Sequence, residues 1–269
     1  MPAPLTFLVD NGSLEPAATL GLRSLAAQLT SVLGTSVEPV SLLHSSGIEP
    51  DRLDGQPAEI LVPALERRLS KGENDFLILP LFFGPSRALT DYIPENIARL
   101  RHKYPELKLN VAAPLHAPSD DRLARIIVDH VTSEMMTFAA ARVVVVDHGS
   151  PVPAVTAVRN ELAQQVGHLL GAHAVVAPAS MERRAGPDYE FCKPLLADLL
   201  DLPPWNEGPV IVAMQFLLPG RHAGPAGDVA EICRGAERAN PQLKTRLTKL
   251  VAEHPLLLEI LEDRWLEAR

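Results

Sequence analysis

Short apolar runs alternate with longer stretches of helical periodicity along the whole chain. Strand-length runs separated by helices are typical of βα units, in which parallel strands form a sheet with helices on its faces. In the first half this pattern predicts strands at 5–9, 37–42, 76–83 and 107–112, and helices at about 15–33, 57–69, 93–102 and 119–138.

The same series then starts again. The second half predicts strands at 142–146, 174–179, 210–217 and 245–250, and helices at about 154–170, 188–201, 228–239 and 255–265. Four βα units therefore occur in each half in the same order. We expect two tandem flavodoxin-like α/β domains, 1–139 and 140–269, each a four-stranded parallel sheet with helices on both faces.

Short sequence matches at corresponding places support a tandem repeat. The segment 9–13 (VDNGS) matches 146–150 (VDHGS), 39–43 (PVSLL) matches 178–182 (PASME), and 81–88 (LFFGPSRA) matches 215–222 (QFLLPGRH). No Gly/Ser-rich linker separates the halves, so we expect them to pack against each other.

Composition and charge narrow the class of protein. Of the 269 residues 46% are hydrophobic and 22% charged, which is typical of a globular protein, and the formal net charge is −8. That charge argues against a nucleic-acid or anionic-membrane surface. The two cysteines form no disulfide scaffold, no apolar run has the length of a membrane span, and the first apolar stretch is too short for a signal peptide. We therefore expect a cytoplasmic protein.

Three polar residues of the second half follow three neighbouring strands. His148 follows the first strand, Glu182 the second and His222 the third. In a doubly wound sheet of order 2-1-3-4 the carboxyl ends of these strands meet at the point where ligands bind. Two imidazoles and a carboxylate suit cobalt, nickel or ferrous iron, whereas each residue taken alone is more often a surface or capping residue. Gly149 and Ser150 also fit a tight turn into a helix.

The first half has lost all three of these residues. Its corresponding positions are Asn11, Leu43 and Ala88. We therefore expect one metal site per chain, in the second half, and a first half that serves as a scaffold. Two other histidines, His116 and His254, each lie close to a proline and are expected to be loop or cap residues.

On these residues the chain resembles the CbiX-type sirohydrochlorin chelatases, the class II chelatases of cobalamin and sirohaem synthesis. The motifs are 148–150 (HGS) after an apolar strand and 216–222 (FLLPGRH) after another, with support from 79–83, 91–94 and 253–257. The resemblance covers nearly the whole chain as two copies of the family unit, the first degenerate. This chain departs from the family pattern at Asp147 and in the longer loop 223–227.

The resemblance implies an ATP-independent lyase that inserts a divalent metal, Co²⁺, Fe²⁺ or Ni²⁺, into sirohydrochlorin, with no other cofactor. His148 and His222 would be the metal ligands, with Glu182 as a ligand or base that accepts a pyrrole proton. The tetrapyrrole would lie in the cleft between the halves, and the chain would be a monomer with an internal pseudo-dimer.

Substrate contacts are expected near the same motifs. These are Gly149, Ser150, Gly220, Arg221, Arg183 and, from the first half, Arg87. Arg221, Arg183 and the neighbouring Arg184 would meet the substrate's carboxylates, because a guanidinium pairs well with a carboxylate. Any one of these arginines alone is more often a solvated surface residue.

Three other functions are considered. A tetrapyrrole or metal carrier would bind without turnover, and Glu182→Ala would then barely matter. A protoporphyrin ferrochelatase would need an aromatic-rich lip facing a membrane, which the aromatic content of 4% disfavours. A hydrolase using Ser150 is the weakest alternative, because the G-x-S-x-G elbow is missing. No Walker or G-x-G-x-x-G turn is present, so no nucleotide is expected.

Overall fold

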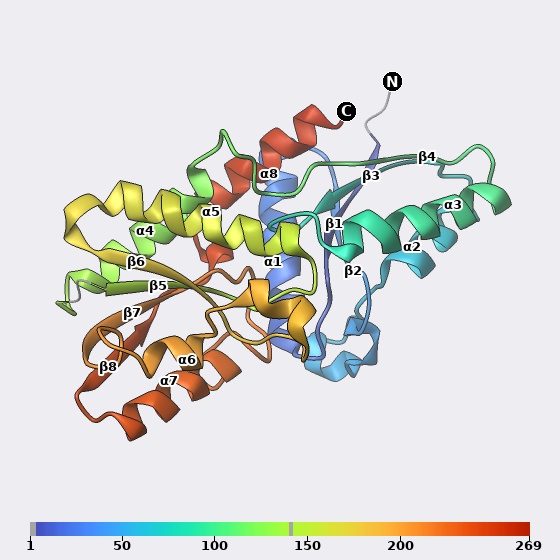
Figure 1. Cartoon of the computed structure of the whole chain (residues 1–269). Helices are drawn as coiled ribbons and strands as arrows, with labels where there is room; N and C mark the ends of the chain where they lie inside the picture. The colour runs from blue at the N-terminus through green and yellow to red at the C-terminus, as the bar shows by residue number, and fades with distance from the viewer. Residues whose placement is uncertain (1–3, 140–141) are drawn as a thin grey trace. The chain divides into compact units, whose positions relative to one another are not determined.

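The structure is a computed structural model that describes residues 4–139 and 142–269. It contains two four-stranded parallel sheets, one from each half of the chain, and in each the strands lie in the order second, first, third, fourth along the sequence. Each sheet has the predicted 2-1-3-4 order, and the predicted α/β class is confirmed (Figure 1). Ala140 and Ala141, beside the predicted boundary between the halves, lie outside the described residues.

The elements follow the predicted series closely. The first sheet and the helices between its strands are β1 (Leu5–Asp10), α1 (Pro16–Leu33), β2 (Val37–Ser41), α2 (Leu61–Leu69), β3 (Asp75–Pro80), α3 (Ile93–Lys103) and β4 (Lys108–Val111). Then follow α4 (Arg122–Met135), β5 (Arg142–Asp147), α5 (Pro153–Leu170), β6 (Val175–Ser180), α6 (Leu196–Leu200), β7 (Gly208–Met214), α7 (Asp228–Ala239), β8 (Leu243–Leu247) and α8 (Leu256–Glu267).

The central strands are buried on both faces, as expected for parallel sheets covered by helices. Val143 to Val146 of β5 are each fully buried. In the first sheet, Phe7 of β1 and Phe76 of β3 stack at 5.9 Å between ring centroids, within the cluster that packs against α2 and α3. The apolar residues within the strands therefore form the core, and the polar residues discussed below lie at the strand ends.

The compact units are not the two halves of the chain. One unit comprises the described residues up to Leu115 together with 258–269, and the other comprises 116–257. Thus α4, which follows the first sheet in sequence, packs on α5 and β7, and most of α8 belongs with the first sheet. In that first unit Trp265 of α8 donates its indole N–H to Thr6 of β1 at 2.9 Å.

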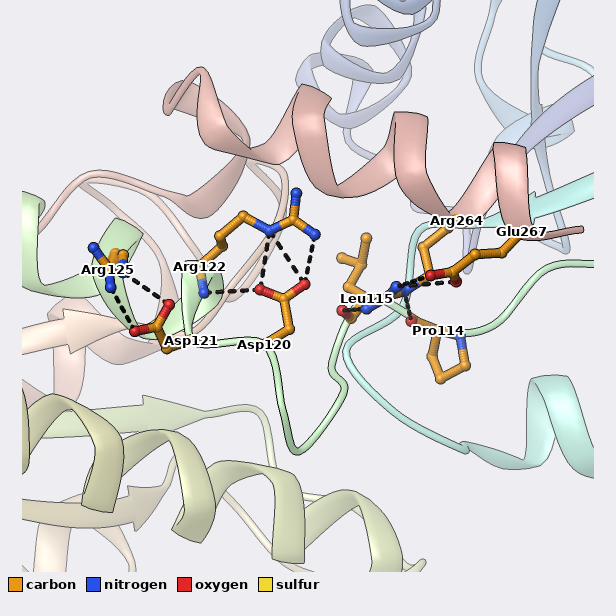
Figure 2. Close-up of polar contacts among 8 residues, drawn as sticks. All are labelled: Pro114, Leu115, Asp120, Asp121, Arg122, Arg125, Arg264 and Glu267. Atoms are coloured by element: carbon orange, nitrogen blue, oxygen red, sulfur yellow. Dashed lines mark hydrogen bonds and ion pairs between the residues drawn. The ribbon is translucent and has the colours of Figure 1, made fainter.

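Arginine contacts hold these two helices, each within its own unit (Figure 2). Arg264 of α8, almost fully buried, donates to the carbonyl oxygens of Pro114 and Leu115 at 3.0 and 3.2 Å. In the second unit, Arg122 and Arg125 at the start of α4 pair with Asp120 and Asp121. Because helical periodicity shows which face is apolar but not which sheet it covers, this arrangement was not predicted.

One predicted helix and two predicted strands are wrong in type or length. The helix expected over 188–201 is a 3-10 turn at Pro187–Cys192 followed by the short α6, because Pro194 has no N–H to continue a helix. The strands expected to reach residues 83 and 217 end at Pro80 and Met214, where the chain leaves each sheet to form the loops described below. Across the described ranges, no helix is both long and apolar enough to span a bilayer.

Candidate metal-binding site

A tight turn after β5 presents His148 at the carboxyl edge of the second sheet. Gly149 has φ +91°, and a Cβ there would lie 1.9 Å from the carbonyl oxygen of Glu182. Glycine is therefore required both by the backbone conformation and by the close approach of the chain after β6. The Glu182 N–H donates to the His148 carbonyl at 3.2 Å, which ties the two strand ends together.

The imidazole of His148 is oriented by its own turn. Its Nδ1 lies 2.9 Å from the carbonyl oxygen of Gly149, and Nε2 lies 3.5 Å from a carboxylate oxygen of Glu182. Since a carbonyl oxygen can only accept, Nδ1 carries the proton of the neutral ring. The Nε2 lone pair is therefore available to a metal ion. The side chains of His148 and Glu182 are 48% and 60% exposed, so a solvated ion can reach both.

A second turn, after β7, presents His222. Gly220 and Ala223 donate N–H groups to each other's carbonyl oxygens at 3.1 and 3.2 Å, which places Arg221 and His222 at the tip of a two-residue turn. The rings of His222 and His148 are in edge-to-face contact, with centroids 4.6 Å apart and planes at 72°. Two histidines separated by 73 intervening residues therefore meet at one edge of the sheet.

A buried polar network lies beneath the two turns. Asp147 accepts hydrogen bonds from the hydroxyl of Ser180 at 2.7 Å and from the N–H of Gly149 at 3.1 Å. Arg159, from the middle of α5, donates to Ser180 Oγ and to the Cys192 carbonyl, and its guanidinium lies 3.9 Å from Asp147. Burial raises the pKa of Asp147, while Ser180 and Arg159 lower it. From the sequence, Asp147 stands out only as a departure from the family pattern. The buried position of Arg159 was not predicted, because a charged residue within a helix usually faces solvent.

His148 is the centre of the predicted ligand set. It contacts both His222 and Glu182, so the convergence predicted from strand order is present. Among the described residues, however, no three His, Cys, Asp or Glu side chains are already arranged to hold a metal ion. All three side chains are partly exposed.

The arginines expected to contact substrate differ in their freedom. Arg221, at the tip of the second turn, is 78% exposed and lies 3.7 Å from Asp228. Arg183 is bound to Glu190 at 2.9 Å and to the Gly186 carbonyl, so it shapes the loop after β6. Arg87 is exposed and belongs to the other compact unit.

Ser150 and the two histidines that lie close to prolines, His116 and His254, have local contacts. The hydroxyl of Ser150 accepts the N–H of Val152 at 3.1 Å and so supports the turn into α5. His254 caps α8 through Nδ1, which accepts the Leu256 N–H at 3.2 Å, and its Nε2 lies 3.2 Å from Asp129. His116 lies 3.3 Å from Glu161. His254 is therefore a cap residue, as predicted.

The first sheet keeps the turn but lacks the ligands. Gly12 has φ +84°, and a Cβ there would lie 1.8 Å from the carbonyl oxygen of Leu43. Asn11 and Leu43 occupy the places of His148 and Glu182 in this turn. Ala88 begins a π-helical turn (Ala88–Tyr92) that continues directly into α3, so the two-residue turn that carries His222 has no counterpart here.

Comparisons with known proteins agree with this architecture. Residues 142–268 match the family model CbiX. The structure of SirB from Bacillus subtilis with Fe³⁺ is 16% identical and covers 98% of this chain and 94% of its own, with a TM-score of 0.74. SirB from Bacillus subtilis subspecies spizizenii in complex with cobalt is 17% identical over the same shares, with a TM-score of 0.71.

A third solved structure, CbiX from denitrifying bacteria, described as the terminal enzyme for biosynthesis of siroheme, is 18% identical. It covers 98% of this chain and 99% of its own, with a TM-score of 0.62. No curated protein is detectably similar in sequence. The chain therefore has the two-sheet fold of these structures, and its second half, residues 142–268, matches the CbiX family model.

Proposed function

We propose that this protein is a sirohydrochlorin chelatase, which inserts a divalent metal ion into a carboxylate-rich tetrapyrrole without a nucleotide. The observation that carries the proposal is the meeting of His148 and His222 at the carboxyl edge of the second sheet, with Glu182 beside His148. The match of residues 142–268 to the CbiX family model and the fold shared with a structure described as a sirohydrochlorin chelatase support it. The metal is Co²⁺ or Fe²⁺, with Ni²⁺ as a third candidate that the same ligands accept.

The proposed reaction exchanges one divalent ion for the two protons on the ring nitrogens. The Nε2 atoms of His148 and His222 hold the ion while ring nitrogens replace its water ligands one at a time. Glu182 accepts a pyrrole proton, because it is a partly exposed carboxylate adjacent to the imidazole that holds the ion. Arg221, at the tip of the same turn as His222, pairs with a substrate carboxylate.

The test is anaerobic incubation with sirohydrochlorin and Co²⁺, Fe²⁺ or Ni²⁺, followed by absorbance. Wild type is expected to accelerate insertion, and His148→Ala and His222→Ala are each expected to abolish the acceleration. His168→Ala, which removes an exposed histidine from α5 of the same unit, is the matched control and keeps the wild-type rate. Wild-type rates in both site variants would refute the assignment.

A carrier function is the second candidate, because the ligand set is not closed in the described residues and a carrier needs only reversible binding. It predicts tight binding of metal or tetrapyrrole without turnover. Glu182→Ala separates the two functions. If the protein is a chelatase, this variant should lose most of its insertion rate. If it is a carrier, the variant should bind metal or tetrapyrrole almost as well as wild type does.

A further inference from the structure

The side chain of His222 is hydrogen-bonded to the first turn of α7. Asp228 is the first residue of α7, and its Oδ2 lies 2.6 Å from Nδ1 of His222. A carboxylate can only accept a hydrogen bond, so Nδ1 carries the proton and Nε2 presents its lone pair. His148 reaches the same tautomer through the neutral carbonyl oxygen of Gly149. Nδ1 of His222 thus faces a charged group, whereas Nδ1 of His148 faces a neutral carbonyl.

Backbone hydrogen bonds and a close approach of the chain also hold Asp228 next to His222. The N–H of Val229 donates to the His222 carbonyl, and that of Asp228 donates to the Arg221 carbonyl, both at 3.3 Å. A Cβ on Gly227 would lie 2.7 Å from the His222 carbonyl oxygen, so glycine allows the helix to begin directly against the turn. Loop 223–227, longer than the family pattern, therefore folds back to deliver Asp228 to His222.

We propose that Asp228 is a positioning residue that fixes the orientation and tautomer of His222 for metal binding. This inference rests on the proposed function, because it assumes that Nε2 of His222 is a ligand. A carboxylate behind a ligand histidine fixes the ring and increases its basicity, and loss of such a partner typically weakens metal binding about 10- to 100-fold. The first sheet, in which Ala88 starts a helix, has no equivalent pair.

The first test measures the tautomer of His222 in metal-free protein by ¹⁵N NMR of the imidazole. Wild type and Asp228→Asn are expected to carry the proton on Nδ1, because the amide oxygen of asparagine still accepts. Asp228→Ala is expected to shift the proton to Nε2. An Nε2–H tautomer in the wild type would overturn the proposal whether or not the protein is a chelatase.

The second test measures Co²⁺ affinity by the visible absorbance of the bound ion. Asp228→Ala is expected to weaken binding about 10- to 100-fold, with a smaller loss in Asp228→Asn. The matched control is Glu231→Gln, which removes a negative charge from the same turn of α7 without contact to His222, and its affinity is expected to equal that of wild type. In a His222→Ala background, Asp228→Ala should cause no further loss.

The two proposals fail in different ways. An undiminished affinity in Asp228→Ala, or a further loss in the His222→Ala background, would overturn the positioning role while wild-type insertion of cobalt kept the proposed function. Conversely, wild type that binds cobalt through both histidines but inserts none would refute chelation. The positioning role would then stand if Asp228→Ala still weakened that binding.

Discussion

The turns after β1 and β5 have the same backbone but different chemistry. Gly12 and Gly149 have nearly the same positive φ, and each faces a carbonyl oxygen from the neighbouring strand end. Beneath each turn lies a buried aspartate, Asp10 or Asp147. The two halves therefore share the glycine and the buried aspartate of this turn and differ in the other side chains that the turn carries. The first sheet keeps the turn although Asn11 and Leu43 stand where the second has His148 and Glu182.

The buried aspartates show the same separation in their surroundings. Asp147 has the guanidinium of Arg159 at 3.9 Å, whereas Leu22 stands at the corresponding place in α1. Oδ1 of Asp10 has no hydrogen-bond partner within the described part of the chain, and burial raises the pKa of Asp10 to about 6. Hydrogen bonds from Ser41 and Gly12 lower the pKa of Asp10, but burial outweighs them, and no arginine stands at the position that Arg159 has beside Asp147.

Replacing Arg159 with leucine makes the second network resemble the first. Arg159→Leu is expected to lower the free energy of unfolding by about 3–5 kcal/mol, because it leaves Asp147 buried without its cation. The measurement is urea unfolding followed by circular dichroism. The control is Arg23→Leu, which removes only hydrogen bonds to the Leu53, Gln56 and Pro57 carbonyls and should lose about 1 kcal/mol. Equal losses would mean that the buried pair contributes nothing special.

The shared turn predicts equal damage in both halves. Gly12→Ala and Gly149→Ala should each lower the free energy of unfolding by about 3 kcal/mol, since positive φ and a clash with backbone oxygen add together. Gly34→Ala is the control, because Gly34 has φ +64° but open space around its Cβ position, and it should lose about 1–2 kcal/mol. A mild effect at Gly12 alone would show that the first turn has relaxed.

Because Asp10 is buried in the first unit, we expect the stability of the protein to depend on its protonation and therefore on pH. Its folded pKa of about 6 lies above the ordinary aspartate value of 3.8, so the folded state binds the proton more tightly and loses stability as pH rises from 4 through 6. Asp10→Asn should therefore be more stable than wild type by roughly 2–3 kcal/mol at pH 8, with no advantage at pH 4. The exposed Asp75→Asn is the control, and a pH-independent difference at Asp10 would contradict this account.

The smallest effect is expected from substitutions at Asn11 and Ala88, the first-half counterparts of His148 and His222. Asn11→Ala and Ala88→Ser should each change the initial rate of cobalt insertion by less than about twofold, because neither residue type offers a metal ligand of the required strength. Steady-state rates with sirohydrochlorin measure this. A tenfold loss in either variant would mean that the first half takes part in the reaction.

The strands and the residues at their ends could be predicted from the sequence because they are local patterns, and the usual order of a doubly wound sheet then predicts that the histidines meet. His148, Glu182 and His222 each follow a strand whose neighbours the 2-1-3-4 order determines. The break at Pro194 carried its own signal, since proline cannot continue a helix, and the prediction passed over it.

Other features depend on contacts that no local pattern encodes. Arg159 is buried in the middle of a helix, and Asp228 looks like an ordinary first-turn acid of α7 until the turn at 220–223 brings His222 to it. Likewise, the sequence alone could not show that Asp228, directly after loop 223–227, lies 2.6 Å from Nδ1 of His222. The packing of α4 and α8 belongs to the same class of features.

The central claim is that the second unit holds one metal site and the first unit holds none. Calorimetric titration of metal-free protein with Co²⁺ tests it directly, using wild type, the His148→Ala/His222→Ala variant and the graft Asn11→His/Leu43→Glu/Ala88→His. We expect one bound ion per chain in wild type, none in the double variant and still one in the graft, because residue 88 starts a helix instead of lying in a turn. Two ions in wild type, or one ion retained by the double variant, would contradict the account.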